Sequence, residues 1–170
     1  MSTWVFMPCS LYLISRTCKQ VFGANARSLQ PQKEQIKAVF ILDMIGYFYL
    51  KNVQDYPPGL KWIYSSHGNF IATLSNFESR ELGSACCEAM KRLNQLDCQR
   101  IVAPSFLAGV DFSDHFNYWQ LGLPAVLITD IAFYRNKAYH SADDRIDRLN
   151  TIKMTQTLNG LVYTLLNNAF

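Results

Sequence analysis

The stretch KAVFILD, residues 37–43, decides the fold class of this chain. Residues 38–42 form an unbroken apolar run with bulky and β-branched side chains. Such a run is typical of a short strand that is buried on both faces of a sheet covered by helices. Asp43 follows the run directly, and ligands of open α/β sheets bind at the carboxyl ends of the strands. The stretch therefore predicts layered α/β structure with a candidate site at Asp43.

Working outward from this strand, apolar runs predict three more strands, at residues 69–74, 100–103 and 124–129. Apolar residues at helical spacing predict an amphipathic helix over residues 78–97. Asn150 is a suitable N-cap for a last helix. Its expected core face consists of Ile152, Leu158, Leu161, Val162, Leu165 and Leu166. The alternation of strands and helices predicts α/β layers around a largely parallel or mixed sheet of about four strands.

The remaining segments are less regular. Residues 4–22 predict a helix that begins near Pro8, because proline is poorly accommodated inside a helix but tolerated in its first turn. Residues 23–34 are polar and contain Pro31, which predicts a linker or loop. Residues 51–68, with Pro57-Pro58-Gly59, also predict a loop.

Length and composition narrow the class of protein. The chain has 170 residues, 49% hydrophobic and 17% charged, which predicts a single globular domain over residues 1–170 rather than a disordered chain. The net charge of +3 comes from scattered Lys and Arg, so nucleic acid is not an expected partner. No apolar run has the length of a membrane span. The N-terminal stretch lacks a basic region and a clear cleavage site, which favours a cytoplasmic location over export by a signal peptide.

The five cysteines do not predict a disulfide framework. Their number is odd, Cys86 and Cys87 are adjacent, and the sequence contains no CxxC motif. Free cysteine is among the most frequently buried residue types. We therefore expect these thiols to be small apolar members of the core, and we expect no reactive thiol at Cys86 or Cys87, which have no base beside them.

Three segments combine carboxylate and imidazole groups: residues 42–47 with Asp43, residues 113–116 with Ser113-Asp114-His115, and residues 139–149 with His140. Zinc takes nitrogen and oxygen ligands of these types. A single strand-end Asp is nevertheless more often a cap or a loop hydrogen-bond acceptor, and a single His is more often a partly buried polar residue. Spacing alone therefore predicts a metal site only weakly.

The other candidate residues give weaker indications of a functional site. Sequence neighbours such as Ser113, Asp114 and His115 cannot converge as a catalytic triad. His67 lies in a polar loop and is expected to be solvated, and Lys51 and Lys137 are expected at the surface. Arg135 is expected either at the surface or as a residue that orients a loop near the site.

The sequence motifs around these residues identify a protein family more specifically than the spacing of the residues does. LDMIGYF, then SDHFNYWQLGLPAVLITD, then FYRNKAYHSADDRIDRLN, occur in this order over about residues 36–168. Together they resemble the family of co-catalytic zinc aminopeptidases, which is related to glutamate carboxypeptidases, glutaminyl cyclases and the transferrin-receptor ectodomain. The resemblance implies a three-layer αβα sandwich with a mixed, mostly parallel sheet, phosphorylase/hydrolase-like and here incomplete at its N-terminal side.

The resemblance also implies roles for single residues. Asp43 matches a carboxylate ligand of one zinc, and His140 matches the histidine ligand of the other. Asp114 matches a carboxylate that lies near the catalytic glutamate without touching the metal, and Tyr139 matches an aromatic residue that lines the substrate pocket. The tail of the third motif is expected to fix the loop behind His140; it comprises Asp144, Asp147 and Leu149.

The sequence departs from the family pattern in two ways. The mild departures are Ser141 and Arg145 in place of threonines, Asn150 in place of an aspartate, and Val110 near the place of a tyrosine in some members. The serious one is upstream. The family has a metal-binding histidine, a bridging aspartate and a Glu-Glu pair before its DMIG motif, whereas residues 1–42 contain no His or Asp and only Glu34.

The resemblance therefore implies a zinc exopeptidase domain, acting on peptides with two zincs in its complete form, that is truncated and inactive alone. An incomplete sheet edge would then call for self-association or a partner chain. A non-catalytic remnant that acts in binding or assembly is the alternative. Glutaminyl-cyclase-like chemistry, with one zinc, is a further alternative within the fold, and the DMIG and FYRN wording favours the peptidase branch over it.

Overall fold

The computed structural model of the chain describes residues 3–8, 23–50, 54–56, 67–93, 96–104, 110 and 113–167. The strands are β1 (Thr3–Pro8), β2 (Ile36–Leu42), β3 (Ile71–Ser75), β4 (Cys98–Val102) and β5 (Ala125–Thr129). The longer helices are α2 (Arg80–Arg92), α3 (His115–Gln120) and α4 (Thr151–Asn167), and the short 3-10 helices are η1 (Gln30–Gln35), η2 (Ala132–Tyr134) and η3 (Ile146–Arg148). The fold is α/β, as the sequence predicts.

The five strands form one mixed sheet in the order β1-β2-β5-β3-β4. β1, β2 and β5 run parallel, whereas β3 is antiparallel to β5 and parallel to β4. β2 and β5 pair in the register Ile41 to Leu127 and Leu42 to Ile128. Because they are parallel neighbours, the loops that follow both strands leave the sheet side by side at one edge.

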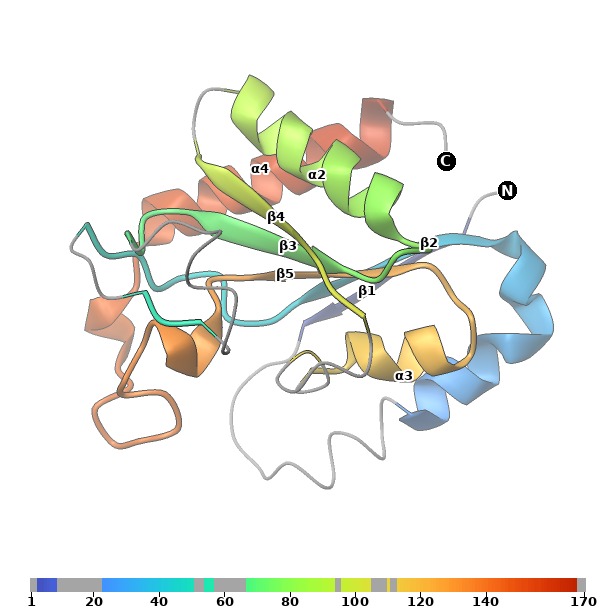
Figure 1. Cartoon of the computed structure of the whole chain (residues 1–170), viewed down its shortest axis with the longest axis horizontal. Helices are drawn as coiled ribbons and strands as arrows, with labels where there is room; N and C mark the ends of the chain where they lie inside the picture. The colour runs from blue at the N-terminus through green and yellow to red at the C-terminus, as the bar shows by residue number, and fades with distance from the viewer. Residues whose placement is uncertain are drawn as a thin grey trace.

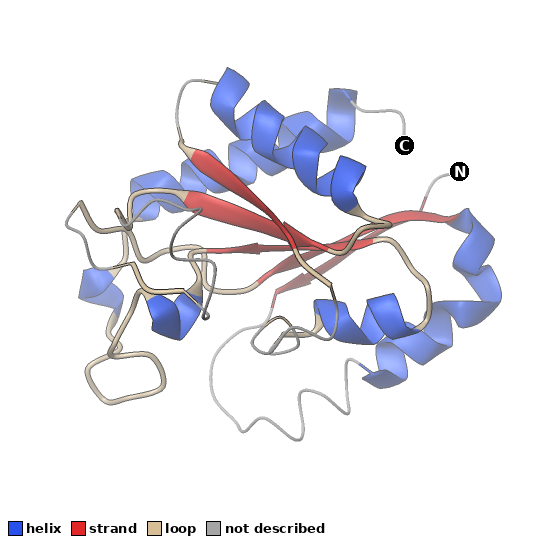
Figure 2. Ribbon diagram, in the orientation of Figure 1, coloured by secondary structure: helices blue, strands red, loops and turns tan. Residues whose placement is uncertain are grey.

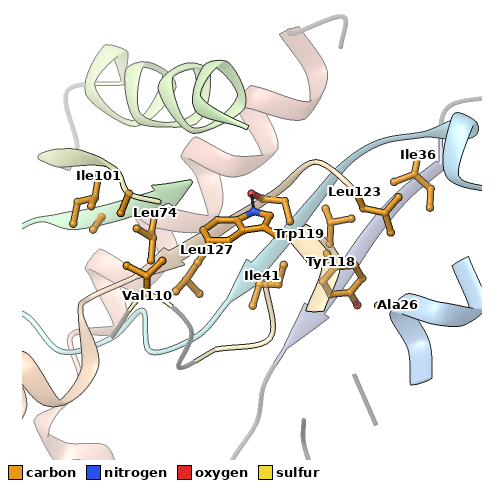
Figure 3. Close-up of a cluster of buried hydrophobic side chains, with 14 of the residues drawn as sticks. Ala26, Ile36, Ile41, Leu74, Ile101, Val110, Tyr118, Trp119, Leu123 and Leu127 are labelled. Atoms are coloured by element: carbon orange, nitrogen blue, oxygen red, sulfur yellow. Dashed lines mark hydrogen bonds between the residues drawn. The ribbon is translucent and has the colours of Figure 1, made fainter. Parts of the chain in front are cut away.

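Helices cover both faces of this sheet, so the fold has three layers (Figures 1 and 2). The alternating side chains of β2 show why: Val39 and Ile41 enter one buried cluster, while Ala38 and Phe40 enter the other. The first cluster lies under α3, where Trp119 packs near Ile41 and donates its indole N–H to the Ala125 carbonyl at 2.8 Å (Figure 3). The second lies under α2 and α4.

The N-terminal expectations were wrong where the structure describes them. Residues 3–8 form strand β1 instead of helix, paired in parallel with β2, and β1 raises the number of strands to five. The expected helix beyond Pro8 lies outside the described residues. Residues 23–34, predicted as a linker or loop, are helical. Ala26 is fully buried there and Leu29 packs against the core, so this polar segment has a single apolar stripe. Pro31 stands at the start of η1, where its missing N–H is tolerated.

The last helix begins where the sequence predicts. The Asn150 side chain accepts a hydrogen bond from the Lys153 amide at 3.0 Å, as an N-cap does. The predicted core face was largely wrong, because the residues that face inward are Thr157, Gly160, Leu161 and Thr164. Gly160 lies against Met90 of α2, which lets the two helices pack closely. Four of the predicted core residues are exposed instead: Ile152, Leu158, Val162 and Leu166.

The cysteine expectation was also wrong in part. Cys87 of α2 and Cys98 at the start of β4 form a disulfide. The two residues are separated by 11 positions, and the helix returns directly to the next strand, which brings their Cα atoms to 5.3 Å. Cys86 is free and buried, as expected for a core thiol, and burial raises its pKa to about 12. Among the described residues, no helix has the length and hydropathy required to cross a bilayer.

Candidate metal-binding site

Asp43 lies at the carboxyl end of β2, directly after the buried strand. Its amide N–H donates to the Ile128 carbonyl of β5 at 3.1 Å, so its backbone is tied to the neighbouring strand. The next residue, Met44, has a positive φ of 56°, which turns the chain sharply away from the sheet. The residue is therefore held at the edge where parallel strands end, which is the usual ligand-binding edge of such sheets.

Two groups act on the Asp43 carboxylate. The Ser113 hydroxyl donates to Asp43 Oδ2 at 2.9 Å. Burial raises the pKa of Asp43, while the Ser113 hydrogen bond and the positive charge of the nearby His140 imidazole act in the opposite direction. Asp43 and His140 are far apart in the sequence, yet they interact electrostatically at this edge. The structure therefore places the two residues that the sequence proposes as metal ligands within electrostatic range of each other.

His140 is exposed and lies in the loop that follows β5 and η2. Its φ is 58°, a left-handed conformation that histidine tolerates better than most residues. The Tyr139 ring meets the imidazole edge to face, with centroids 4.0 Å apart and planes at 84°. Tyr139 in turn lies 6.0 Å from the Phe133 ring. An aromatic wall therefore flanks the imidazole on one side, where a bound side chain could rest.

The segment Ser113-Asp114-His115 does not form a catalytic triad. Ser113 points to Asp43, and His115 is fully buried with its ring edge-on to Trp119 at 4.4 Å. Asp114 is buried and starts α3. Its negative charge adds to burial in raising the pKa of Tyr118 to about 12. The sequence therefore excluded the triad correctly, but it missed Ser113 as the residue of this segment that touches Asp43.

The tail of the third motif contributes to the loop behind His140 in three different ways. Asp144 accepts a hydrogen bond from the fully buried Asn136 side chain at 2.9 Å, which closes the loop around His140. Asp147 is exposed and pairs with Arg145, an ion pair that contributes little in water. Leu149 lies against Gly46, where an added Cβ would approach the Met154 and Leu149 side chains to 3.0 and 3.1 Å. His67, expected to be solvated, is exposed.

Two buried charged residues lie near the same edge: sequence reasoning missed Asp130 and left two alternatives open for Arg135. Asp130 follows β5 as Asp43 follows β2, and this shared strand-end position was the available signal. Arg135 was expected at the surface or beside the site, and it is 2% exposed. Burial raises the pKa of Asp130 to about 7 and lowers that of Arg135 to about 10, while their mutual attraction opposes both changes.

Backbone strain gathers at this edge of the sheet. Besides Met44 and His140, the other non-glycine residues with positive φ in the described chain are Ile131 at 70° and Ala132 at 43°. A left-handed conformation is unusual for a β-branched residue such as Ile131. Such strain costs on the order of 1–3 kcal/mol per residue and clusters at functional sites. All four strained residues lie in the loops that carry Asp43 and His140.

The proposed ligands of this site are of the types that zinc binds, but they are fewer than a catalytic zinc usually has. A carboxylate oxygen and an imidazole nitrogen are ligands that zinc takes, and a catalytic zinc usually has three protein ligands. No group of three or more His, Cys, Asp or Glu side chains that could hold a metal ion occurs within the described residues. Asp43 and His140 could therefore supply part of a metal site, with at least one more ligand from outside the part of the chain that is described.

An open groove of about 600 Å³ lies next to this edge. Tyr47 and Tyr49 stack in it with parallel rings, and the Arg148 guanidinium lies 5.3 Å from the Tyr47 ring centre. The rest of its lining is Phe48, Leu149, Asn150, Thr151 and Ile152. Tyr139, the residue expected to line a substrate pocket, is not part of this lining, so that role stays a prediction.

Comparison with known proteins places these features in a family context. The family model for peptidase family M28 matches residues 19–165. The uncharacterised protein YfbL of Escherichia coli K12 is 40% identical over 148 residues, which are 86% of this chain and 45% of that protein.

Two solved structures of LapA from Legionella pneumophila, one of them described as an aminopeptidase, share the fold. Their TM-scores are 0.62 and 0.64 at 16% and 17% identity, and the matches cover 90% and 91% of this chain. They cover only 36% and 38% of the LapA chains. The chain thus spans less than half the length of each of these relatives.

Proposed function

The chain belongs to peptidase family M28, and from this membership we propose that it is the C-terminal part of a zinc-dependent exopeptidase of the aminopeptidase type. In this proposal Asp43 and His140 are metal ligands and peptides are the substrates. The observation that carries it is that Asp43 and His140 lie within electrostatic range of each other near the edge where β2 and β5 end. The aminopeptidase description of LapA supports the proposal at the level of the shared fold.

The described residues would have separate roles in binding the metal and the substrate. Zinc, when bound, supplies a Lewis acid that polarises a peptide carbonyl and activates water. Asp43 and His140 would offer it one oxygen and one nitrogen donor. Ser113 would fix the orientation of the Asp43 carboxylate through its hydrogen bond. The Tyr139 ring would limit the space beside His140 and so contribute to the choice of substrate side chain. Asp114 would act at a distance from the metal, as the resemblance implies.

We further propose that residues 1–170, taken as a single truncated domain, are inactive or nearly so on their own. Metal-assisted hydrolysis needs a base that takes the proton of the attacking water. Upstream of Asp43 the carboxylate is Glu34, which is exposed in η1 and has no second Glu beside it. Two zincs would need further ligands and a bridging carboxylate as well. The missing groups would come from chain outside this sequence or from a partner.

The alternative is a non-catalytic protein that retains the fold for binding or assembly. One observation favours it: the exposed side of α4 carries four large apolar residues, with exposures from 45% for Leu158 to 79% for Leu166. An apolar surface of this kind is typical of an interaction site. Metal binding discriminates between the two functions, since a binding protein has no need for zinc at Asp43 and His140.

Zinc affinity therefore tests the proposal. We expect the chain to bind zinc weakly, as measured by competition with a chromophoric chelator. Asp43→Asn and His140→Ala should each weaken this binding by about tenfold or more, because even partners of metal ligands change affinity by 10–100-fold. His67→Ala, which removes an exposed histidine far along the chain, is the matched control and should change nothing. Equal zinc affinity in the wild-type chain and both site variants would contradict the proposal.

A further inference from the structure

Two buried residues of opposite charge lie between the loops that carry Asp43 and His140. Asp130 is fully buried and Arg135 is 2% exposed. Asp130 follows strand β5 directly, and Arg135 follows the strained turn at Ile131 and Ala132. Neither residue belongs to the ligand pair proposed above. Buried charges are costly unless they are paired and hydrogen-bonded, so the bonds they make indicate what they are for.

The Asp130 carboxylate binds main-chain groups on both sides. Its Oδ2 accepts from the Tyr47 amide at 2.7 Å and from the Gly46 amide at 3.1 Å. Its Oδ1 accepts from the Ala132 amide at 3.0 Å. The first two amides belong to the segment that leaves Asp43, and the third belongs to the loop that leads to His140. One carboxylate therefore joins the two segments, while the Asp130 amide also donates to the Met44 carbonyl.

Arg135 makes the complementary bonds. Its Nη1 donates to the Tyr47 carbonyl at 3.2 Å and to the Phe70 carbonyl at 2.8 Å. Its Nε donates to Gln54 Oε1 at 2.6 Å, and its guanidinium lies 4.4 Å from the Phe70 ring centre. Tyr47 is thus held through its amide by Asp130 and through its carbonyl by Arg135. The two charged groups grip the same peptide segment, three to four positions beyond Asp43.

General stabilisation of the fold is a weak reason for burying two charged groups. An apolar pair of similar volume often stabilises a fold as well as a buried ion pair does. The arrangement also requires left-handed backbone at Ile131 and Ala132, which is costly. The hydrogen bonds of the two charged groups instead fix where the Asp43 segment lies relative to the His140 loop.

We propose that Asp130 and Arg135 are positioning residues that clamp residues 44–47 against residues 131–136, and thereby set the placement of Asp43 relative to His140. The meaning of that placement for metal binding rests on the proposed function, whereas the clamp itself does not. Burial raises the pKa of Asp130 to about 7 and lowers that of Arg135 to about 10, so it disfavours the charged form of each group, whereas the mutual attraction of the two groups favours it.

The clamp can be tested without metal by NMR of the full chain. The chain has three histidines, so the ring signals of His140 can be assigned with His140→Ala. In the wild-type background, Asp43→Asn should shift the His140 ring signals, because it removes the nearby carboxylate charge. In the Asp130→Asn and Arg135→Gln backgrounds, the same change should produce less than about half of that shift, since coupling between two residues depends on their placement.

The matched control is Thr73→Val. Thr73 is fully buried in β3 and its hydroxyl donates to the Gly83 carbonyl at 3.1 Å, so the variant destabilises the sheet without touching either loop. Thr73→Val should preserve the full shift at His140. The proposal is overturned if folded Asp130→Asn and Arg135→Gln chains also preserve it. It is equally overturned if Thr73→Val reduces the shift as much as they do, since general loss of stability would then be the cause.

Two further measurements test the clamp even if the Asp130→Asn or Arg135→Gln chain fails to fold. Gln54→Ala removes a single hydrogen bond from Arg135 and should reduce the coupling in the same direction by a smaller amount. In the wild-type chain, the amides of Gly46, Tyr47 and Ala132 should exchange with solvent slowly and at similar rates, because all three donate to one buried carboxylate. Fast exchange at these amides would show that the clamp does not hold.

A zinc titration followed at the His140 ring then separates the two proposals. If zinc affinity falls with Asp43→Asn and also with Asp130→Asn, the clamp positions metal ligands. If Asp43→Asn leaves zinc affinity unchanged while the metal-free coupling depends on Asp130, the proposed function fails and the clamp stands.

Discussion

At the residue scale, the site depends on where two carboxylates stand. Asp43 and Asp130 both follow buried strands, and β2 and β5 are parallel neighbours, so the two residues leave the sheet at the same edge. Their surroundings then separate their roles. The Asp43 carboxylate is half-buried and accepts a hydrogen bond from the Ser113 hydroxyl, which leaves it able to bind a ligand. Asp130 is enclosed by main-chain amides and can only hold structure.

The protonation of Asp130 makes stability depend on pH. Burial raises the pKa of Asp130 from 3.8 to about 7, so the folded chain retains a proton that the unfolded chain has already lost. The stability from this proton is fully present below about pH 4 and is lost as pH rises through about 7, by up to about 1.4 kcal/mol per pH unit. Urea unfolding across this range should show the loss in the wild-type chain, and Asp130→Asn should not show it. Parallel pH profiles for the two proteins would contradict the assignment.

Much of the candidate site could be predicted from the sequence at this scale, and the rest could not for physical reasons. Asp43 and His140 were proposed as ligands because they stand in specific motifs, and that role stays a prediction. Arg135 gave no sign of being buried, since charge usually places arginine at the surface. Its burial is possible because it donates hydrogen bonds to the carbonyls of Tyr47 and Phe70 and to the Gln54 side chain. Those carbonyls come from segments that are separate in the sequence, so no local sequence pattern indicates that both lie beside Arg135.

At the scale of elements, α2 is the best-anchored helix. It packs on β3 and β4, it lies against α4, and its Cys87 is bonded to Cys98 at the start of β4. The sequence predicted the helix but not the bond, because two adjacent cysteines give no information on which of them faces the next strand. Strands β2, β3 and β5 were predicted because their apolar runs require burial on both faces, and β4 from a weaker run, whereas the residues of β1 were assigned to a helix.

We expect the Cys87–Cys98 disulfide to stabilise the fold. By the chain-entropy model, a bond that closes a loop of this length contributes roughly 3 kcal/mol. Thermal unfolding of Cys87→Ala and Cys98→Ala should therefore occur at a clearly lower temperature than that of the wild-type chain. A reductant should lower the transition of the wild-type chain and leave that of the variants unchanged. Cys86→Ala is the control, and its transition should still respond to reductant; an unresponsive wild-type chain would argue against the bond.

The close packing of α2 on α4 depends on Gly160. A Cβ at this position would collide with the Met90 side chain and approach its Cα to 3.2 Å. Gly160→Ala gains about 1 kcal/mol of helix propensity but should lose about 1–3 kcal/mol through overpacking, so we expect net destabilisation in urea. Gly23→Ala, where the nearest atom would lie at an ordinary 3.4 Å, should be neutral or stabilising. A more stable Gly160→Ala chain would show that the helices can separate freely.

At the scale of the whole molecule, the described part of the chain leaves large apolar side chains of α4 at the surface. In the described sheet, β1 and β4 stand at the two ends and pair on one side only. The apolar residues of α4 that the sequence assigned to the core lie at the surface, because periodicity identifies an apolar stripe but not the element that covers it. Both features agree with a chain that spans less than half the length of its relatives.

This uncovered surface predicts self-association of the isolated chain. Sedimentation velocity should show association that increases with concentration, driven by burial of apolar surface. Leu158→Glu combined with Val162→Glu should reduce it. Lys91→Gln combined with Arg92→Gln changes the net charge by the same amount on exposed positions of α2 and should leave association unchanged. A monomer at all concentrations, or equal effects of both double variants, would contradict this expectation.

The central claim is that Asp43 and His140 form part of a zinc site that this chain does not complete alone. The most direct test is the zinc content per chain after dialysis against trace zinc, measured by elemental mass spectrometry. The account predicts well under one retained zinc per chain and no hydrolysis of aminoacyl substrates. One or two tightly held zincs per chain, lost in His140→Ala, would contradict it by showing that the site is already complete.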